Sequence, residues 1–258
     1  MRARTFVFLC CFLVLLNVSA AQAVTTVKVL AYPFPPFMND DGKTGITPDI
    51  LRLLNEEQST YQFELMVVRP QDRYDPILSA KADMMFFEME QWNWKDKVDR
   101  VDFSKLLMKG GEVYIAKRKP EQLRFDFNQI ESRKILGFEG YHYEFAGLNA
   151  DQDWLKSKYN ISFATSHYDM LRSIKADEAE IAIATLSFLK QYFHENPQEL
   201  LTYVISQEFA QVYNLRALVR KDGPLDLTKL ESLLQDIKKK GQLQDMLQSY
   251  GILRQWQF

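Results

Sequence analysis

Cysteine is almost absent from this chain. Cys10 and Cys11 are the two cysteines among 258 residues, and both lie in an apolar segment at the N-terminus. The rest of the chain therefore has no disulfide framework and no thiol nucleophile. Histidine is nearly as rare, and His142, His167 and His194 are scattered without the spacing typical of metal ligands. We therefore predict no metal site.

An excess of charge of one sign is also missing. The chain has 32 basic and 34 acidic side chains, with a formal net charge of −2 at pH 7. A nucleic-acid-binding domain carries a basic stripe, so we expect no nucleic-acid partner. Neither a nucleophile elbow nor a glycine-rich phosphate loop occurs. We therefore assign no catalytic residue and no cofactor.

The first 23 residues have the pattern of a cleaved signal peptide. Arg2 and Arg4 precede an apolar run over residues 6–16, and Ala21-Gln22-Ala23 supplies a small-x-small cleavage site. The run is shorter than the ~20 residues that span a bilayer. We predict cleavage near Ala23 and a periplasmic location; a retained membrane anchor is the alternative.

The stretch from Ala31 to Leu51 combines aromatic rings with a stiff backbone. Its rings belong to Tyr32, Phe34 and Phe37, which are interspersed with three prolines. A turn at 39–42 follows, and Thr47 is expected to act as N-cap of a helix. This places the rings at the carboxyl end of a strand, where open α/β sheets bind ligands. The alternative is that the rings only cap the core.

Apolar periodicity predicts alternating strands and helices. In the first part, strands at 27–32, 61–68 and 83–89 alternate with helices that begin at Thr47 and Arg73, a βαβαβ order. Gly110-Gly111 indicates a hinge, because glycine lets the backbone change course. Further strands are expected at 112–117, 135–138, 161–164, 180–184, 201–205 and 215–220, with helices near Tyr143 and over 168–174, 186–193, 227–238 and 243–250.

Several short motifs, in this order and spacing, resemble those of one protein family. They are Phe34-Pro35-Pro36-Phe37 with Gly42, Gly45 and Asp49; Lys81-Ala82-Asp83; Val101-Asp102-Phe103-Ser104; Gly137-Phe138-Glu139-Gly140; and Lys240-Gly241-Gln242-Leu243 followed by Tyr250-Gly251. The chain thereby resembles the family 3 extracytoplasmic solute-binding proteins, the amino-acid-type periplasmic binding proteins of ABC transporters.

The resemblance implies an α/β fold of the two-lobe, type II periplasmic-binding-protein kind. Lobe 1 would comprise residues 24–110 and 207–258, and lobe 2 residues 111–206, with a small polar molecule held between them. It further implies a non-enzymatic monomer that delivers its ligand to an ABC transporter permease. Closure would be a hinge motion near Gly110-Gly111 and a return strand near 207–213.

Four positions depart from the amino-acid-binding pattern that the resemblance implies. Lys97 stands where the family has an arginine for the ligand's α-carboxylate, and lysine lacks the bidentate fork. Thr185 stands where the family has an aspartate for the α-amino group. Glu88 and Glu90 replace small or hydroxylated residues. We therefore expect a ligand other than a standard α-amino acid.

Three interpretations of these departures remain open. The ligand of a binding protein could be cationic or polyhydroxylated, since carboxylates and the rings of Trp92 and Trp94 suit such groups. A dehydratase-like periplasmic enzyme could use Glu88 and Glu90 as acid and base, although such glutamates are more often solvated or paired with lysines. A sensory module is the third. The predicted ligand-binding residues are Tyr32, Phe34, Phe37, Tyr74, Glu88, Glu90, Trp92, Trp94, Lys97, Gly140, Tyr141, His142 and Thr185.

Overall fold

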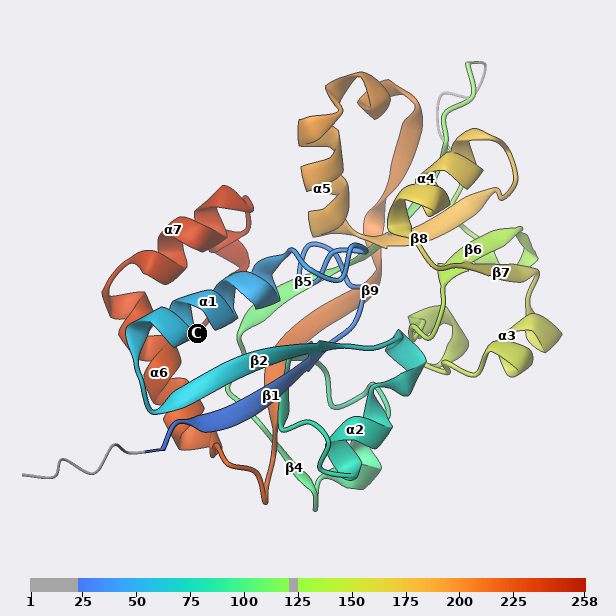
Figure 1. The fold of residues 1–258 in the computed structure, drawn as a ribbon. Coiled ribbons are helices and arrows are strands. Elements are labelled where there is room, and N and C mark those ends of the chain that lie inside the picture. The colour runs from blue at the N-terminus through green and yellow to red at the C-terminus, as the bar shows by residue number, and fades with distance from the viewer. Residues whose placement is uncertain (1–22, 121–124) are drawn as a thin grey trace, which may run out of the picture.

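The computed structural model describes residues 23–120 and 125–258 (Figure 1). The predicted signal peptide lies, apart from its last residue, outside this part of the chain. Within the described residues, no helix is both long and apolar enough to cross a bilayer. The strands form a mixed sheet in the order β2-β1-β3-β9-β5-β8-β6-β7, with β4 paired to β9. Two lobes flank the middle of this sheet, and the predicted α/β class is confirmed.

Lobe 1 is built around β1, which pairs in parallel with β2 on one side and β3 on the other. Helix α1 covers this sheet together with the two C-terminal helices, and α2 lies on the opposite side (Figure 1). Its elements are β1 (Thr25–Ala31), α1 (Ile46–Glu57), β2 (Tyr61–Val67), α2 (Tyr74–Leu78), β3 (Met84–Glu88), β4 (Val101–Phe103), α6 (Leu227–Lys239) and α7 (Gln242–Ser249).

Lobe 2 has a smaller sheet in which β6 pairs in parallel with β7 and β8. The predicted strands at 135–138 and 161–164 are confirmed at both ends. Helix α3 was not predicted, and the helix expected near Tyr143 is a short 3-10 turn over Glu144–Ala146. The elements are β6 (Ile135–Phe138), α3 (Gln152–Lys158), β7 (Ile161–Ala164), α4 (His167–Lys175), β8 (Ile181–Thr185) and α5 (Leu186–Glu195).

Two long antiparallel strands, β5 (Met108–Lys117) and β9 (Tyr203–Arg220), join the lobes. The first part of β9 pairs with β5, whereas its last residues pair with β3 and β4 of lobe 1. Strand β5 in turn pairs with β8 of lobe 2. The prediction of separate strands at 201–205 and 215–220 was wrong, because the intervening residues stay extended against β5. The exact lobe boundaries remain a prediction.

The aromatic loop after β1 folds back onto the start of α1. The backbone N–H groups of Ile46 and Thr47 donate to the carbonyls of Pro36 and Phe37. Gly45 precedes them at φ 130, where an added Cβ would lie 2.9 Å from the carbonyl oxygen of Phe37. The predicted capping role of Thr47 was therefore wrong: α1 has Gly45 as N-cap, and loop carbonyls accept the hydrogen bonds that a hydroxyl cap would accept.

The close approach of β5 and β9 depends on Gly111. A Cβ at Gly111 would lie 2.4 Å from the carbonyl oxygen of Gln211 and 2.5 Å from the Phe209 ring, whereas one at Gly110 would be 3.8 Å from its nearest neighbour. We predict that Gly111→Ala lowers the free energy of unfolding by ~1–3 kcal/mol through overpacking. Gly110→Ala is the matched control and should change it by less than ~0.5 kcal/mol. Urea unfolding measures both, and equal effects would contradict this account.

Candidate functional site

A small enclosed space lies where the two lobes meet β5 and β9. The volume that the centre of a water molecule can occupy between the lining side chains is ≈ 10 Å³, roughly what one water molecule requires. Its lining residues come from lobe 1 (Tyr32, Phe34, Arg73, Trp92), from lobe 2 (Tyr141, His142) and from the two joining strands (Glu112, Gln211, Tyr213). We call this space the cleft cavity.

Aromatic rings form most of the cavity wall. The Phe34 ring meets Trp92, Tyr141 and Tyr213 with centroids 5.6–5.8 Å apart and planes at 71–87°. Trp92 and Tyr213 are likewise perpendicular, at 5.4 Å. Phe34 also packs on Phe37, which stacks on Phe87 of β3 at 4.4 Å. Such edge-to-face contacts are favourable, so the rings hold the two lobes together around the cavity.

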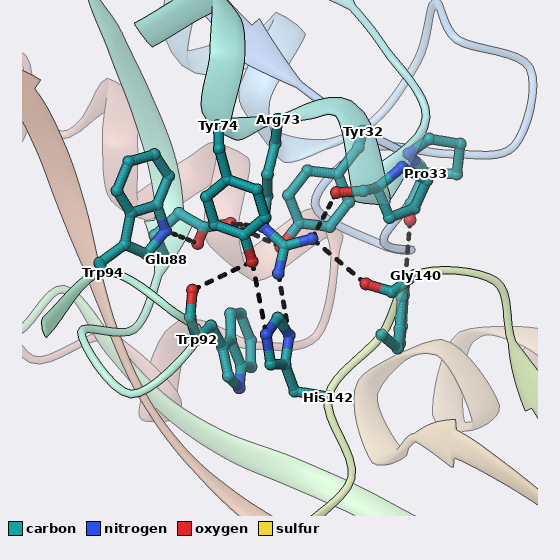
Figure 2. Close-up of polar contacts among 11 residues, drawn as sticks. Tyr32, Pro33, Arg73, Tyr74, Glu88, Trp92, Trp94, Gly140 and His142 are labelled. Carbon is teal, nitrogen blue, oxygen red and sulfur yellow. Dashed lines mark hydrogen bonds and ion pairs between the residues drawn. The ribbon is translucent and has the colours of Figure 1, made fainter. Parts of the chain in front are cut away.

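A buried ion pair lies beside the cavity (Figure 2). Arg73, 1% exposed, precedes α2, and Glu88, 0% exposed, ends β3. Arg73 Nε lies 3.6 Å from Glu88 Oε1. The hydrogen-bond donors to this carboxylate are the Tyr32 hydroxyl, at 2.6 Å from Oε1, and the Trp94 indole N–H, at 2.7 Å from Oε2. The guanidinium thus has its counter-ion inside lobe 1.

The two members of this pair have shifted pKa values. Burial raises the pKa of the Glu88 carboxyl, and Arg73 and the hydrogen bonds from Tyr32 and Trp94 oppose that rise. Burial is the largest influence on Arg73 and acts to lower its pKa, but the Glu88 carboxylate and the neighbouring tyrosine hydroxyls together outweigh burial and raise the pKa overall. Arg73 therefore stays charged, and its charge is balanced locally.

The same guanidinium reaches across to lobe 2. Its terminal nitrogens donate to the carbonyl of Gly140 (3.3 Å) and to His142 Nδ1 (2.9 Å), as Figure 2 shows. Because Nδ1 accepts this bond, the proton of neutral His142 lies on Nε2, which faces the Tyr74 hydroxyl at 3.4 Å. Burial, with the Arg73 charge, lowers the pKa of His142 to about 2. His142 is accordingly neutral.

Further contacts fasten the aromatic loop of lobe 1 to lobe 2. The Tyr141 and Thr185 hydroxyls donate to the carbonyls of Pro33 and Pro35, each at 2.7 Å. Asp40 accepts from the backbone N–H of His167 (2.6 Å) and lies 2.8 Å from its ring Nδ1. The two lobes are therefore in direct contact, and the structure has a closed cleft.

Glu112 is a second buried carboxyl and, unlike Glu88, lines the cavity itself. It lies on β5, paired in register with Thr185 of β8 and Gln211 of β9, and is 1% exposed. The Tyr213 hydroxyl donates a hydrogen bond to it. Burial, which this hydrogen bond only partly offsets, raises the pKa of Glu112 to about 8. At neutral pH the carboxyl is therefore mostly protonated.

Gln211 links the cavity wall to both lobes. With its side-chain amide turned to satisfy both neighbours, Gln211 donates to the carbonyl of His142 (2.8 Å) and accepts from the Trp92 indole N–H (2.9 Å). The polar atoms of Trp92 and His142 are thus engaged within the wall. The groups that remain to face a ligand are aromatic surfaces and the Glu112 carboxyl.

The structure gathers many of the predicted site residues. Five line the cavity: Tyr32, Phe34, Trp92, Tyr141 and His142. Three pack behind it as support: Phe37, Glu88 and Trp94. The Tyr74 ring packs against Trp94 at a tilt and its hydroxyl donates to the carbonyl of Trp92, and Gly140 supplies a carbonyl to Arg73. Their role in binding a ligand remains a prediction.

The last three of the thirteen predicted site residues do not line the cavity either. Lys97 donates to the carbonyl of Asn93 and to Asp96, 2.8 and 2.7 Å away. Thr185 uses its hydroxyl on Pro35 and caps α5. Glu90 is half-buried and lies beyond the end of β3, because the strand ends at Glu88. Two residues two positions apart share a face only within one strand, so Glu90 does not join Glu88.

Sequence reasoning missed four lining residues: Arg73, Glu112, Gln211 and Tyr213. A signal for Glu112 was present, because a lone acid directly after Gly110-Gly111 opens an otherwise apolar strand segment, Val113–Ala116. An isolated charge in such a strand indicates a buried functional or paired group. Arg73 had no comparable signal, since its neighbours Asp72 and Asp75 make it look like part of a solvated turn.

We predict that Arg73 contributes to stability through Glu88. Arg73→Met leaves a buried, unpaired carboxylate and should lower the free energy of unfolding by ~3–5 kcal/mol. The double variant Arg73→Met/Glu88→Gln should recover more than half of that loss, since the amide still meets Tyr32 and Trp94. Denaturant unfolding of both single variants and the double variant completes the cycle. Additive losses would show that the two side chains act independently.

A second prediction concerns pH. Between its unfolded pKa near 4.5 and its folded pKa near 8, Glu112 binds a proton in the folded state that it releases on unfolding. The folded state therefore loses stability as pH rises through this window, by up to ~1.4 kcal/mol per pH unit. Glu112→Gln removes this term, so its stability relative to the unmodified protein should increase from pH 5 to pH 8. A constant difference across that range would refute the assignment.

The sequence matches the family of bacterial extracellular solute-binding proteins, family 3, over residues 27–252. No curated protein sequence is similar enough to count as a match. Solved structures share the fold. One is a mutant of ArgBP from T. maritima, 16% identical, with a TM-score of 0.65 over 87% of this chain and 94% of that chain.

Two further structures are similar. A putative L-cystine ABC transporter protein from Listeria monocytogenes is 13% identical, with a TM-score of 0.67 over 91% of this chain and 99% of its own. A substrate-binding protein of an ABC uptake transporter from Streptococcus pneumoniae, solved with histidine, is 14% identical, with a TM-score of 0.66 over 87% and 92%. The fold, the cleft between its lobes and the family match together show that this chain belongs to the bacterial extracellular solute-binding proteins, family 3.

Proposed function

We propose that the protein captures a small polar molecule, other than a standard α-amino acid, in its cleft and delivers it to an ABC-type uptake system in the periplasm. Membership of the solute-binding family supports capture of a small solute. Similar structures described as ABC transporter proteins support the uptake role. The monomeric state and the identity of the permease are part of the same proposal.

One observation carries the exclusion of standard amino acids: the cavity has no arginine free to hold a carboxylate. Arg73 is the single arginine that lines it, and Glu88 already balances its charge. A ligand carboxylate would have to compete with this buried counter-ion, which has two further hydrogen-bond donors. Lys97, at the position expected to replace the family's arginine, binds Asp96 away from the cavity.

The position expected to hold the α-amino group is also occupied. Thr185 carries no charge, and its hydroxyl proton is donated to the carbonyl of Pro35. A hydroxyl cannot balance an ammonium group in a desolvated site. Both halves of zwitterion recognition, for the carboxylate and for the amino group, are therefore missing from the positions where the family has them.

The enzymatic alternative needs two carboxyl groups able to exchange protons with a substrate. Glu88 is fully buried with both oxygens accepting hydrogen bonds, and Glu90 lies outside the cavity lining. General acid–base catalysis requires a carboxyl within hydrogen-bond reach of the substrate. The geometry of this pair thus favours binding over turnover.

The proposal predicts the outcome of a thermal-shift screen. None of the twenty standard amino acids at millimolar concentration should stabilise the protein, whereas a ligand with a micromolar Kd would add about 4 kcal/mol. Native mass spectrometry of freshly purified protein would identify a co-purified ligand. That ligand should raise Tm and remain unchanged on prolonged incubation.

Two variants that each remove an aromatic ring test whether the ligand-induced rise in Tm arises from binding in the cleft cavity. Phe34→Ala removes a ring from the cavity wall and should abolish the ligand-induced rise in Tm. Trp154→Ala removes an exposed ring of α3 and should leave the rise intact. Stabilisation by a standard amino acid, or conversion of the ligand into a product, would contradict the proposal.

A further inference from the structure

Glu112 has a buried carboxyl group, and no cationic side chain among the described residues pairs with it. It lines the cleft cavity, is 1% exposed, and has the Tyr213 hydroxyl as its hydrogen-bond donor. No lysine, arginine or histidine of the described residues contributes to its ionisation. A buried carboxyl without a cationic partner is costly, so its placement in the wall of a ligand cavity calls for an explanation.

The charges around the cavity single out Glu112. Arg73 and Glu88 compensate each other, and His142 is neutral. The remaining lining residues are aromatic side chains and the Gln211 amide. Once ionised, Glu112 would therefore give the cavity a net charge of −1, which a monovalent cation would neutralise.

The aromatic wall favours the same kind of ligand. The rings of Phe34, Trp92 and Tyr213 stand perpendicular to one another, so that faces and edges alternate around the cavity. Aromatic faces attract ammonium groups through the ring quadrupole, most strongly in desolvated sites. An anionic ligand would be repelled both by the negative ring faces and by the ionised Glu112 carboxylate.

We propose that Glu112 is the counter-ion of a small organic cation, an alkylammonium compound without a carboxylate group, held against the rings of Phe34, Trp92 and Tyr213. This assignment rests on the proposed function, because it names the ligand class of the same cleft. In this proposal the positive charge of the ligand is recognised by a residue of β5, one of the two strands that join the lobes. The Arg73–Glu88 pair then has a structural role only.

The dimensions of the closed cavity set the mode of binding. The ≈ 10 Å³ open to the centre of a water molecule suits one group of the size of water, such as an ammonium head. The carbon part of the ligand requires the rings that now touch one another to separate. Binding therefore takes place with the lobes apart, and on closure the rings pack on the ligand in place of one another.

Binding also changes the protonation of Glu112. In the closed structure the protonated carboxyl interacts with the hydroxyl groups of Tyr213 from β9, Tyr114 from β5, and Tyr141 and Tyr143 from the loop after β6. Arg73 and His142 line the same cavity. When R–NH3⁺ binds, the carboxylate form becomes the stable one, and the carboxyl proton leaves for solvent. One cation is taken up and up to one proton is released, so charge balances.

The test uses three compounds of nearly equal shape with the full mature protein. Butylammonium is cationic, butan-1-ol is its neutral counterpart, and 4-aminobutanoate adds a carboxylate; choline and putrescine extend the cationic arm. Isothermal titration calorimetry at pH 7 should show binding of at least one cation and neither of the other two. Repeating the titration in phosphate and in HEPES, two buffers that differ in ionisation enthalpy and are not alkylammonium cations without an acid group, counts the protons released.

Two variants separate charge recognition from folding. Glu112→Gln should weaken cation binding by roughly 30-fold or more and abolish proton release, while circular dichroism confirms that it folds. Glu144→Gln alters an exposed carboxyl nearby and should change neither. An unchanged affinity in Glu112→Gln, or cation binding without proton release, would overturn the assignment.

The outcomes also distinguish the two proposals. A neutral or anionic molecule that co-purifies and stabilises the protein would overturn the cationic ligand and leave the solute-binding function standing. Failure of every small molecule to bind, in a protein that folds normally, would overturn both.

Discussion

The buried pair of Arg73 and Glu88 is the constraint on which the arrangement of the cleft depends. Glu88 ends β3 with its oxygens held by Tyr32 and Trp94, and this fixes the guanidinium between the lobes. From there Arg73 reaches the Gly140 carbonyl and His142 of lobe 2. Because a buried charge needs both a counter-ion and hydrogen bonds, loosening any of these contacts raises the cost of the others. The interior of lobe 1 is thus coupled to closure of the cleft.

Much of the fold was predictable because it follows local periodicity. Strands β6 and β7 have the bounds that apolar alternation indicates. The predicted helices, apart from the one near Tyr143, begin within a few residues of their expected starts, whereas α3 was missed. The errors occur where contacts distant in sequence decide the conformation. Strand β9 runs unbroken because β5 pairs with it along much of its length, and α1 needs no hydroxyl cap because the proline loop folds back onto its N–H groups.

The aromatic residues of the site could be predicted from the sequence, whereas the pairing of its charged residues could not. Tyr32 and Phe34 lie on a stiff loop at a strand end, a position that sequence alone marks as ligand-facing. Whether a charge is free depends on its partner, and Arg73 and Glu88 are 15 positions apart with no helical or strand spacing between them. Lys97 was placed in the site by its position in a motif, yet its own loop supplies the acceptors that hold it elsewhere.

Closure of the cleft uses backbone carbonyls of the proline loop that have no hydrogen-bond donor within the loop. Proline lacks an N–H group and disrupts regular pairing, so the carbonyls of Pro33 and Pro35 remain available to the Tyr141 and Thr185 hydroxyls. These bonds join the two lobes, and they place Tyr141 against Phe34 at the cavity wall. Specificity must then come from the groups that closure leaves without a charged partner. In this cleft the described residue that fits that condition is Glu112, whose carboxyl faces a space lined by rings and compensated charges.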